Sequence, residues 1–400
     1  MCALWRNVAS HSAQIHTSRI KTADRPPQTW AWIALAAILL LALAVLLRPN
    51  PARPQDFYQD WASARNLAAG RAPYAKLDGW LFEYNAHPPT SILLAVPFAG
   101  LDYITASVAW NLFCLALLAA SVALLLAELR PGAGPASFAT AMLLLCLWPP
   151  LWEHLTQGQL SLAMLFLLTL AWREARHGRD RSAGALLGLA AALKLFPALL
   201  ILYFAVHRRW RLASLACASL LALTALTLCI TGPAAFHEYA ATVLPALARW
   251  DTHSGNASLN GFFSRLLAPA LGHTVTLAVT WAVCASVAIA VGLRSARANF
   301  DEGFALAVTG LLLVTPLTWQ HSLTMLLLPL GIYLAGIANR GPLSRCCAVA
   351  GCLLLSLPSA ILPGFPPAAH PGIAANLTVL SLNFYGLACF WLAQLPPTRD

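Results

Sequence analysis

Charged side chains are scarce in this sequence. Only 10% of its 400 residues are Asp, Glu, Lys or Arg, and only 15 are acidic, whereas 59% are hydrophobic. Soluble domains carry about 25% charged residues and about 45–50% apolar ones. Because so few charges cannot cover a water-exposed surface, the composition excludes a soluble globular protein. It predicts a polytopic membrane protein.

Several kinds of site are also missing. No cluster of His, Cys or carboxylate residues has metal-ligand spacing, and neither a GxGxxG nor a Walker phosphate loop occurs. The net charge is +10, but the basic residues form short clusters between apolar runs. This pattern is typical of cytoplasmic loops that touch anionic lipids. We therefore expect membrane lipids as partners, and no metal, cofactor, nucleic acid or nucleotide-sugar donor.

The apolar runs predict an all-α membrane protein with about twelve transmembrane or part-spanning helices. These lie near residues 30–47, 105–127, 136–150, 159–172, 183–193, 197–206, 212–231, 273–293, 303–317, 322–338, 346–362 and 373–394. The domain boundaries follow from these runs. We expect a cytoplasmic tail at 1–29, a single transmembrane domain at 30–394 with exterior loops at about 48–104, 151–158 and 232–272, and a cytoplasmic tail at 395–400.

One apolar stretch must contain a helix break if its two basic flanks are to lie on the same side of the membrane. Residues 183–207 have basic clusters at both ends, so a single span would leave one cluster outside. Lys194-Leu195-Phe196-Pro197 lies in the middle, and Pro removes a backbone hydrogen-bond donor. The sequence therefore predicts two short helices that form a hairpin and return to the cytoplasm.

The first exterior loop is rich in acids and opens with a helical pattern. Asp56 is suited to the start of a helix that ends near Gly70, and Asp60 would share its face. In one interpretation Asp56 only caps the helix and Asp60 is a solvated surface acid. In the other, the two carboxylates form a catalytic site.

This loop resembles that of the glycosyltransferase 87 family, membrane-embedded C-type glycosyltransferases related to polyprenyl-phosphate-mannose-dependent α-mannosyltransferases. The matching segments, in order, are DFYQDW (56–61), ARNLAAG (64–70), AGRAPY (69–74), HPP (87–89), Gly158-Gln159 with Ser161, residues 184–200, NASLNG (256–261) with Arg265, and PLTWQH (316–321). Family members commonly have tyrosine at the position of His87. The resemblance covers most of residues 56–330.

The resemblance implies a metal-independent, inverting hexosyltransferase at the outer face of the inner membrane. Its donor would be a polyprenyl-phosphate sugar, most simply mannose, and its acceptor a hydroxyl of a glycolipid or cell-envelope glycan. A sugar hydroxyl is a poor nucleophile, so a carboxylate must take its proton. By the family motif this catalytic residue is Asp56.

The leaving phosphate needs cations or oriented donors. The candidates are Arg265, Lys194, His321 and Arg65. Three of them have a structural alternative: Arg265 would snorkel at the interface, Lys194 would bind the carbonyls of a broken helix, and His321 would be an interfacial histidine.

The remaining substrate-binding candidates come from the same family segments. They are Asp60, Tyr74, His87, Gln159, Asn256, Asn260 and Trp319. Gln159 belongs to a polar connection with Glu153, His154 and Gln157, which we interpret either as an ordinary wet turn or as a lining of the acceptor cleft.

Two other functions fit the composition. One is a transporter or flippase for a lipid-linked glycan, and the other is a non-catalytic subunit for polysaccharide assembly. Transporters often contain internal repeats and midplane charges, whereas here no repeat occurs and most acids fall on the exterior side.

Overall fold

The computed structural model describes residues 56–77, 83–357 and 372–395, together with Ala34, Leu35, Ile38 and Ala42. Every regular element in these parts of the chain is a helix. The predicted tail 1–29 and nearly all of the first predicted span, 30–47, lie outside the described residues, as does the tail 395–400 apart from Leu395.

Four segments of the described chain are long and apolar enough to cross a membrane. They are α4 (Tyr103–Leu129), α10 (Trp210–Thr231), α13 (Leu259–Ser295) and the segment 373–393, which contains α17 (Ile373–Leu377) and α18 (Leu382–Ala393). A fifth is formed if α5 (Pro135–Cys146) and α6 (Pro149–Gln157), which meet at a 73° bend, are counted as one span. The protein is a polytopic membrane protein, and the predicted number of about twelve spans stays a prediction.

The other α-helices are shorter or less apolar than these spans. They are α2 (Phe57–Ala68), α3 (Pro89–Ala95), α7 (Ser161–Arg176), α8 (Asp180–Leu193), α9 (Ala198–Val206), α11 (Pro233–Glu238), α12 (Leu244–Ala246), α14 (Phe300–Val314), α15 (Leu327–Ala335), α16 (Pro342–Leu355) and the 3₁₀ helix η4 (Gln320–Leu326).

The start of α13 differs from prediction. The helix begins at Leu259, within the stretch expected to be an exterior loop, because the Ser258 side chain caps it by accepting a hydrogen bond from the Gly261 backbone N–H at 3.0 Å. The predicted start of this span, residue 273, coincides with a kink at Gly272, whose φ is +76°. Sequence hydropathy therefore located the kink and missed the polar first turns.

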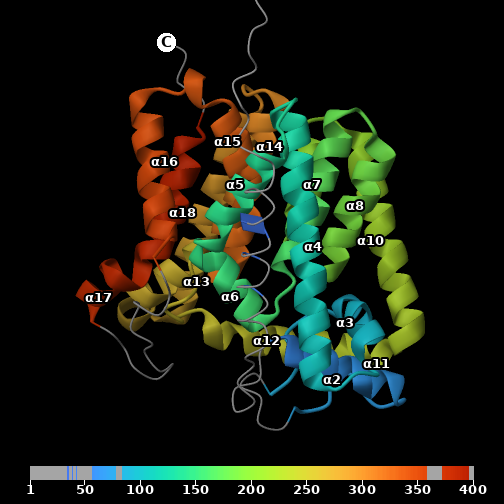
Figure 1. Cartoon of the computed structure of the whole chain (residues 1–400). Coiled ribbons are helices and arrows are strands. Elements are labelled where there is room, and N and C mark those ends of the chain that lie inside the picture. Colours follow the sequence, from blue (N-terminus) through green and yellow to red (C-terminus); the bar gives the residue numbers. More distant parts are fainter. Residues whose placement is uncertain are drawn as a thin grey trace, which may run out of the picture.

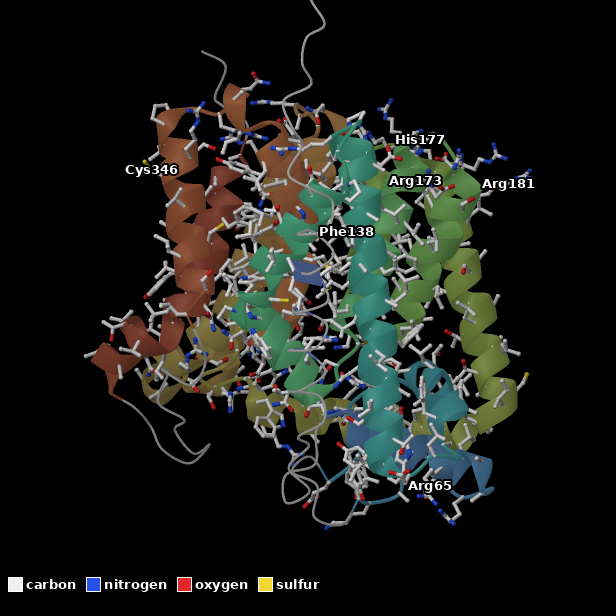
Figure 2. All side chains as sticks on the ribbon, in the orientation of Figure 1. Arg65, Phe138, Arg173, His177, Arg181 and Cys346 are labelled. Atoms are coloured by element: carbon white, nitrogen blue, oxygen red, sulfur yellow. The ribbon has the colours of Figure 1, made fainter. Side chains whose placement is uncertain are left out.

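The two ends of the bundle are different in kind (Figure 1). Helices α2, α3, α11 and α12 gather at one end, drawn at the bottom. Arg173, His177 and Arg181 lie at the opposite end, while Arg65 of α2 lies at the bottom (Figure 2). We call these the α2 end and the arginine end.

The predicted break into two short helices is confirmed, and their return to the cytoplasm stays a prediction. Helix α8 stops at Leu193, α9 starts at Ala198, and an ion pair between Arg209 and Asp180 brings the two outer ends together. Helix α10 packs parallel to α8 over two glycines. A Cβ atom at Gly184 would lie 2.8 Å from the Leu212 carbonyl oxygen, and one at Gly188 would lie 2.5 Å from that of Ala216. Only glycine permits this close approach.

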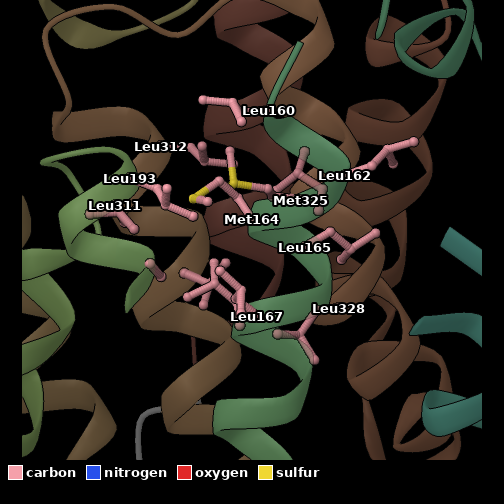
Figure 3. Close-up of a cluster of buried hydrophobic side chains, with 14 of the residues drawn as sticks. Leu160, Leu162, Met164, Leu165, Leu167, Leu193, Leu311, Leu312, Met325 and Leu328 are labelled. Carbon is pink, nitrogen blue, oxygen red and sulfur yellow. The ribbon is translucent and has the colours of Figure 1, made fainter. Parts of the chain in front are cut away.

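A buried apolar cluster lies where α7, α14, η4 and α15 meet the end of α8 (Figure 3). It includes Leu160 and Leu193, which are 2% and 5% exposed. Leu160 follows Gln159 directly, and Leu193 precedes Lys194. Because close-packed interiors deform little, this cluster fixes the backbone at two of the polar residues considered next.

Candidate active site

Asp56 starts α2 but does not cap it. The residue occupies the N-cap position without a side-chain capping bond, and its Oδ2 instead accepts a hydrogen bond from Gln159 Nε2. Phe57 fixes this end of the helix by stacking on Trp110, with ring centroids 5.1 Å apart and planes at 10°. The interpretation of Asp56 as a simple cap is therefore wrong.

Gln159 bridges Asp56 to a cation. While its Nε2 donates to Asp56, its Oε1 accepts from Lys194 Nζ at 3.3 Å. The three side chains come from the start of α2, the turn after α6 and the break after α8. A carboxylate and an ammonium group are thus held on opposite sides of one amide.

The turn before Gln159 requires glycine. Gly158 ends α6 with φ +65°, and an added Cβ would lie 2.7 Å from the Cβ of Phe57. Its carbonyl accepts from Trp110 Nε1 at 2.7 Å. The same tryptophan therefore supports both Phe57 and the turn that presents Gln159.

Lys194 lies where the hairpin reverses. Its backbone is extended, with φ −141° and ψ +135°, and the preceding Leu193 carbonyl, left free by the helix break, accepts from Ser91 Oγ at 2.5 Å. Ser91, rather than Lys194, therefore meets this broken-helix carbonyl, which leaves the ammonium group for Gln159.

The environment of Asp56 shifts the pKa of its carboxyl. Burial raises the pKa of its carboxyl from 3.8 to about 6. The hydrogen bond from Gln159 and the charges of His87 and Lys194 oppose that rise, while Glu153 adds to it. A carboxylate with a pKa just below neutrality combines sufficient basicity with ionisation at physiological pH.

Asp60 has a different role from Asp56. It is only 4% exposed, and both of its carboxylate oxygens lie 2.9–3.0 Å from His87 Nδ1. Asn85 Nδ2 donates to its Oδ1 at 3.1 Å. The prediction of a solvated surface acid is wrong for Asp60, since tertiary contacts from the chain after α2 cover it.

The segment around His87 is tied down at its backbone. The Tyr74 hydroxyl donates to the His87 carbonyl at 2.6 Å, and the His87 N–H donates to Asn85 Oδ1 at 2.8 Å. The Tyr74 ring also packs against Tyr239, with centroids 5.9 Å apart. Tyr74 and His87 thus belong to one set of contacts that covers the face of α2 carrying Asp60.

Two histidines near Lys194 are buried with free ring nitrogens. His154 is 0% exposed, and neither ring nitrogen has a hydrogen-bond partner among the described residues. His321 is 4% exposed and its Nε2 is likewise without a partner there. His154, within α6, and Gln159, in the turn after it, are both buried, so the wet-turn interpretation is wrong at these two residues. Unsatisfied polar groups are costly inside a protein and are typical of functional sites.

Arg265 ties two segments together in this structure. Its Nη1 donates to the carbonyls of His253 and Asn256 at 2.8 and 2.9 Å, and its Nη2 donates to Ser381 Oγ at 3.3 Å. These contacts favour a structural role for Arg265, and its contact with the leaving phosphate stays a prediction. The guanidinium is buried, so this role is not the snorkelling at the interface that the sequence suggested.

Asn256 and Asn260 join the same region to the end of α14. Both side chains donate to the Pro316 carbonyl, at 3.0 and 3.3 Å. Trp319 packs edge-on against His253, with centroids 5.0 Å apart. These candidates hold the segment that leads into His321, and the structure gives them packing partners within the protein.

Arg65 lies apart from the other candidates. It is exposed at the α2 end, with its guanidinium 4.9 Å from the centroid of the Trp61 ring (Figure 2). Nine residues separate it from Asp56, so the two occupy opposite faces of α2.

Sequence reasoning missed Asn85 and named His154 only as part of a polar connection, not as a site residue. Asn85 is 0% exposed and its amide contacts Gln59, Asp60 and Ser63. Nothing in its local sequence marks it. His154 had one available signal, which was its place in a polar turn next to Gly158-Gln159.

Three comparisons with known proteins each found a similar family or chain. The model of "Glycosyltransferase family 87" matches residues 85–316, more than half of the chain. A similar curated protein is the polyprenol-phosphate-mannose-dependent alpha-(1-2)-phosphatidylinositol mannoside mannosyltransferase of Mycobacterium tuberculosis (strain ATCC 25618 / H37Rv), 28% identical over 326 residues, covering 75% of this chain and 74% of the relative. Among solved structures, ArnT from Cupriavidus metallidurans bound to undecaprenyl phosphate has 18% identity and a TM-score of 0.40, covering 92% of this chain and 76% of the other.

Proposed function

The chain belongs to glycosyltransferase family 87, and from this premise we propose that it transfers a hexose, in the first instance mannose, from a polyprenyl-phosphate donor to a hydroxyl of a glycolipid or cell-envelope glycan. The observation that carries the proposal is the chain of contacts from Asp56 through Gln159 to Lys194. A carboxylate suited to accept a proton and an ammonium group suited to contact a phosphate lie on two sides of one amide, which supports the proposal. The name of the mycobacterial relative supports the choice of donor.

The proposed reaction uses Asp56 and Lys194, the two side chains that Gln159 connects. Asp56 takes the proton of the acceptor hydroxyl while the hydroxyl oxygen forms a bond to the anomeric carbon. The bond from that carbon to the phosphate oxygen breaks on the opposite face, and its electron pair leaves with the polyprenyl phosphate. Lys194, with the free nitrogens of His154 and His321 nearby, meets the increased negative charge. Attack opposite to the leaving group inverts the anomeric configuration.

The activity is tested with purified protein in nanodiscs. Labelled sugar should pass from polyprenyl-phosphate mannose to a glycolipid acceptor without added metal, and the label should be lost from the donor in equal amount. Movement of intact donor across a vesicle membrane without transfer would instead identify a transporter. The proposal would be overturned if the protein neither transferred nor transported any polyprenyl-phosphate hexose.

We propose further that the α2 end faces the exterior of the inner membrane. The arginine end carries the basic clusters that normally stay in the cytoplasm. In a protein without native cysteines, an impermeant thiol reagent added to intact cells should label K76C and spare R181C and R208C. Labelling of R208C from outside would reverse this orientation.

A further inference from the structure

Trp110 of α4 is 2% exposed and contacts two segments that lie far apart in the sequence. Its ring stacks on Phe57, with centroids 5.1 Å apart and planes at 10°. Its Nε1 donates a hydrogen bond to the Gly158 carbonyl at 2.7 Å. Phe57 directly follows Asp56, and Gly158 directly precedes Gln159. One side chain therefore contacts the neighbours of both residues that the hydrogen bond from Gln159 to Asp56 joins.

The packing around the indole leaves it little freedom to move. An added Cβ atom at Gly158 would lie 2.7 Å from the Cβ of Phe57 and 3.6 Å from Cδ1 of Trp110, so these three residues are already closely packed. Phe98 packs edge-on against both rings, with centroids 5.8 Å from Trp110 and 6.1 Å from Phe57. Because such a close-packed cluster deforms little, the positions of Phe57 and Gly158 are fixed relative to each other.

Helix α4 holds the rest of the turn before α7 in the same way. Asn111 Nδ2 donates to the Leu155 carbonyl at 3.0 Å, and Cys114 Sγ is 3.9 Å from the Gln159 carbonyl oxygen. With Trp110, these residues occupy about one turn of α4, a helix of 27 residues that runs along the bundle (Figure 1). The turn that carries Gln159 is thus anchored to a long membrane-spanning helix.

We propose that Trp110 is a positioning residue that sets the placement of Gln159 relative to Asp56. The proposal rests on the proposed function, because Asp56 is the base of that reaction. The two residues lie 103 positions apart, so their geometry depends on a support that both segments share. A misplacement of about 1 Å at a reacting group can cost roughly 10²-fold in rate. The indole provides the shared support through the stacking on one side and the hydrogen bond on the other.

The test is a double-mutant cycle on the kcat of sugar transfer, with Trp110→Phe and Gln159→Ala. Trp110→Phe keeps an aromatic ring beside Phe57 and removes the N–H that the Gly158 carbonyl accepts. Each single variant should lower kcat roughly tenfold, and Trp110→Phe should leave the KM of the donor within about twofold. The double variant should lose little more than either single variant, because both changes disturb the same contact with Asp56.

Trp61→Phe is the matched control. Trp61 is buried on α2 and its Nε1 donates to the Leu101 carbonyl at 3.2 Å, so the variant loses the same kind of hydrogen bond. Its kcat should stay within about twofold of wild type. Phe57→Leu removes the stacking from the side of Asp56 and should lower kcat as Trp110→Phe does. It decides the question if Trp110→Phe does not fold.

Two outcomes would overturn the proposal. One is a multiplicative loss of roughly 100-fold in the double variant, which would show that Trp110 acts independently of Gln159. The other is an unchanged kcat in folded Trp110→Phe with a lowered melting temperature, which would show that the indole only stabilises the fold. Failure of the proposed function is seen separately, because wild-type protein would then transfer no sugar.

Discussion

The surroundings of Glu128 at the arginine end and of Asp56 at the α2 end differ in how completely their polar groups are paired. At the arginine end, Glu128 accepts hydrogen bonds from Arg173 and Arg176, at 2.8 and 3.1 Å, and lies 3.0 Å from His177. Arg340 pairs with Glu302 at 2.6 Å. At the α2 end, Asp56 is paired with a neutral amide, and His154 has no partner among the described residues.

This difference separates stability from reactivity. Full pairing lowers the energy of the folded protein and leaves the paired groups little capacity for new contacts. Incomplete pairing costs stability and leaves groups that can bind a substrate. The comparison predicts that substitutions at the α2 end change activity more than stability, and that substitutions at the arginine end do the reverse.

The largest effect is expected for Asp56→Asn. It preserves shape and removes the proton acceptor, so the rate of sugar transfer should fall roughly 10²–10⁴-fold, with donor binding and melting temperature nearly unchanged. Initial rates and thermal unfolding in nanodiscs measure both quantities. An active Asp56→Asn enzyme would reject the assignment of the base.

Lys194→Gln should follow. Losing one charged donor at the proposed position of the leaving phosphate should cost roughly 10²-fold in kcat. The effect falls on kcat because the negative charge on the phosphate increases only as the bond to the sugar breaks. Arg65→Gln removes a positive charge from the exposed face of α2 and is the matched control, with unchanged kcat expected. Equal losses in the two variants would mean that net charge, rather than the position of Lys194, matters.

Gly158→Ala tests the support of the site. The positive φ and the 2.7 Å approach to Phe57 strain any side chain at this position, so the variant should lose roughly 1–3 kcal/mol of stability. It should also lose activity, because Gln159 shifts with the turn. Gly178→Ala has a similar φ of +72° but open space around its Cβ, and it should keep its activity. A fully active Gly158→Ala enzyme would show that the placement of Gln159 is not needed.

The smallest effect on activity is expected at the arginine end. Glu128→Gln leaves three basic partners without their carboxylate, so the melting temperature should fall by an amount that corresponds to about 1–3 kcal/mol. The kcat of the folded protein should stay within about twofold, since the change is far from Asp56. A large fall in kcat with an unchanged melting temperature would contradict the comparison between the two ends.

The sequence predicted local features well and tertiary ones poorly. The break at Lys194 to Pro197 and the end of α2 before Gly70 follow from backbone chemistry, which acts over a few residues. The burial of Asp60 depends on residues about 25 positions away, and the bond from Gln159 to Asp56 spans 103 positions. No periodicity encodes such pairs, so the contact between Gln159 and Asp56 could not be predicted and Asn85 was missed.

The hairpin of α8 and α9 also constrains how the protein is made. Neither helix is long enough to cross the bilayer, and Lys194 at their junction carries a charge that hydrocarbon does not tolerate alone. The groups that accept this hairpin are Gln159, synthesised before it, and the face of α10, synthesised after it. During translation the pair therefore reaches its final depth only once α10 has emerged from the ribosome. The lysine of the proposed site therefore also belongs to a step of assembly that depends on α10.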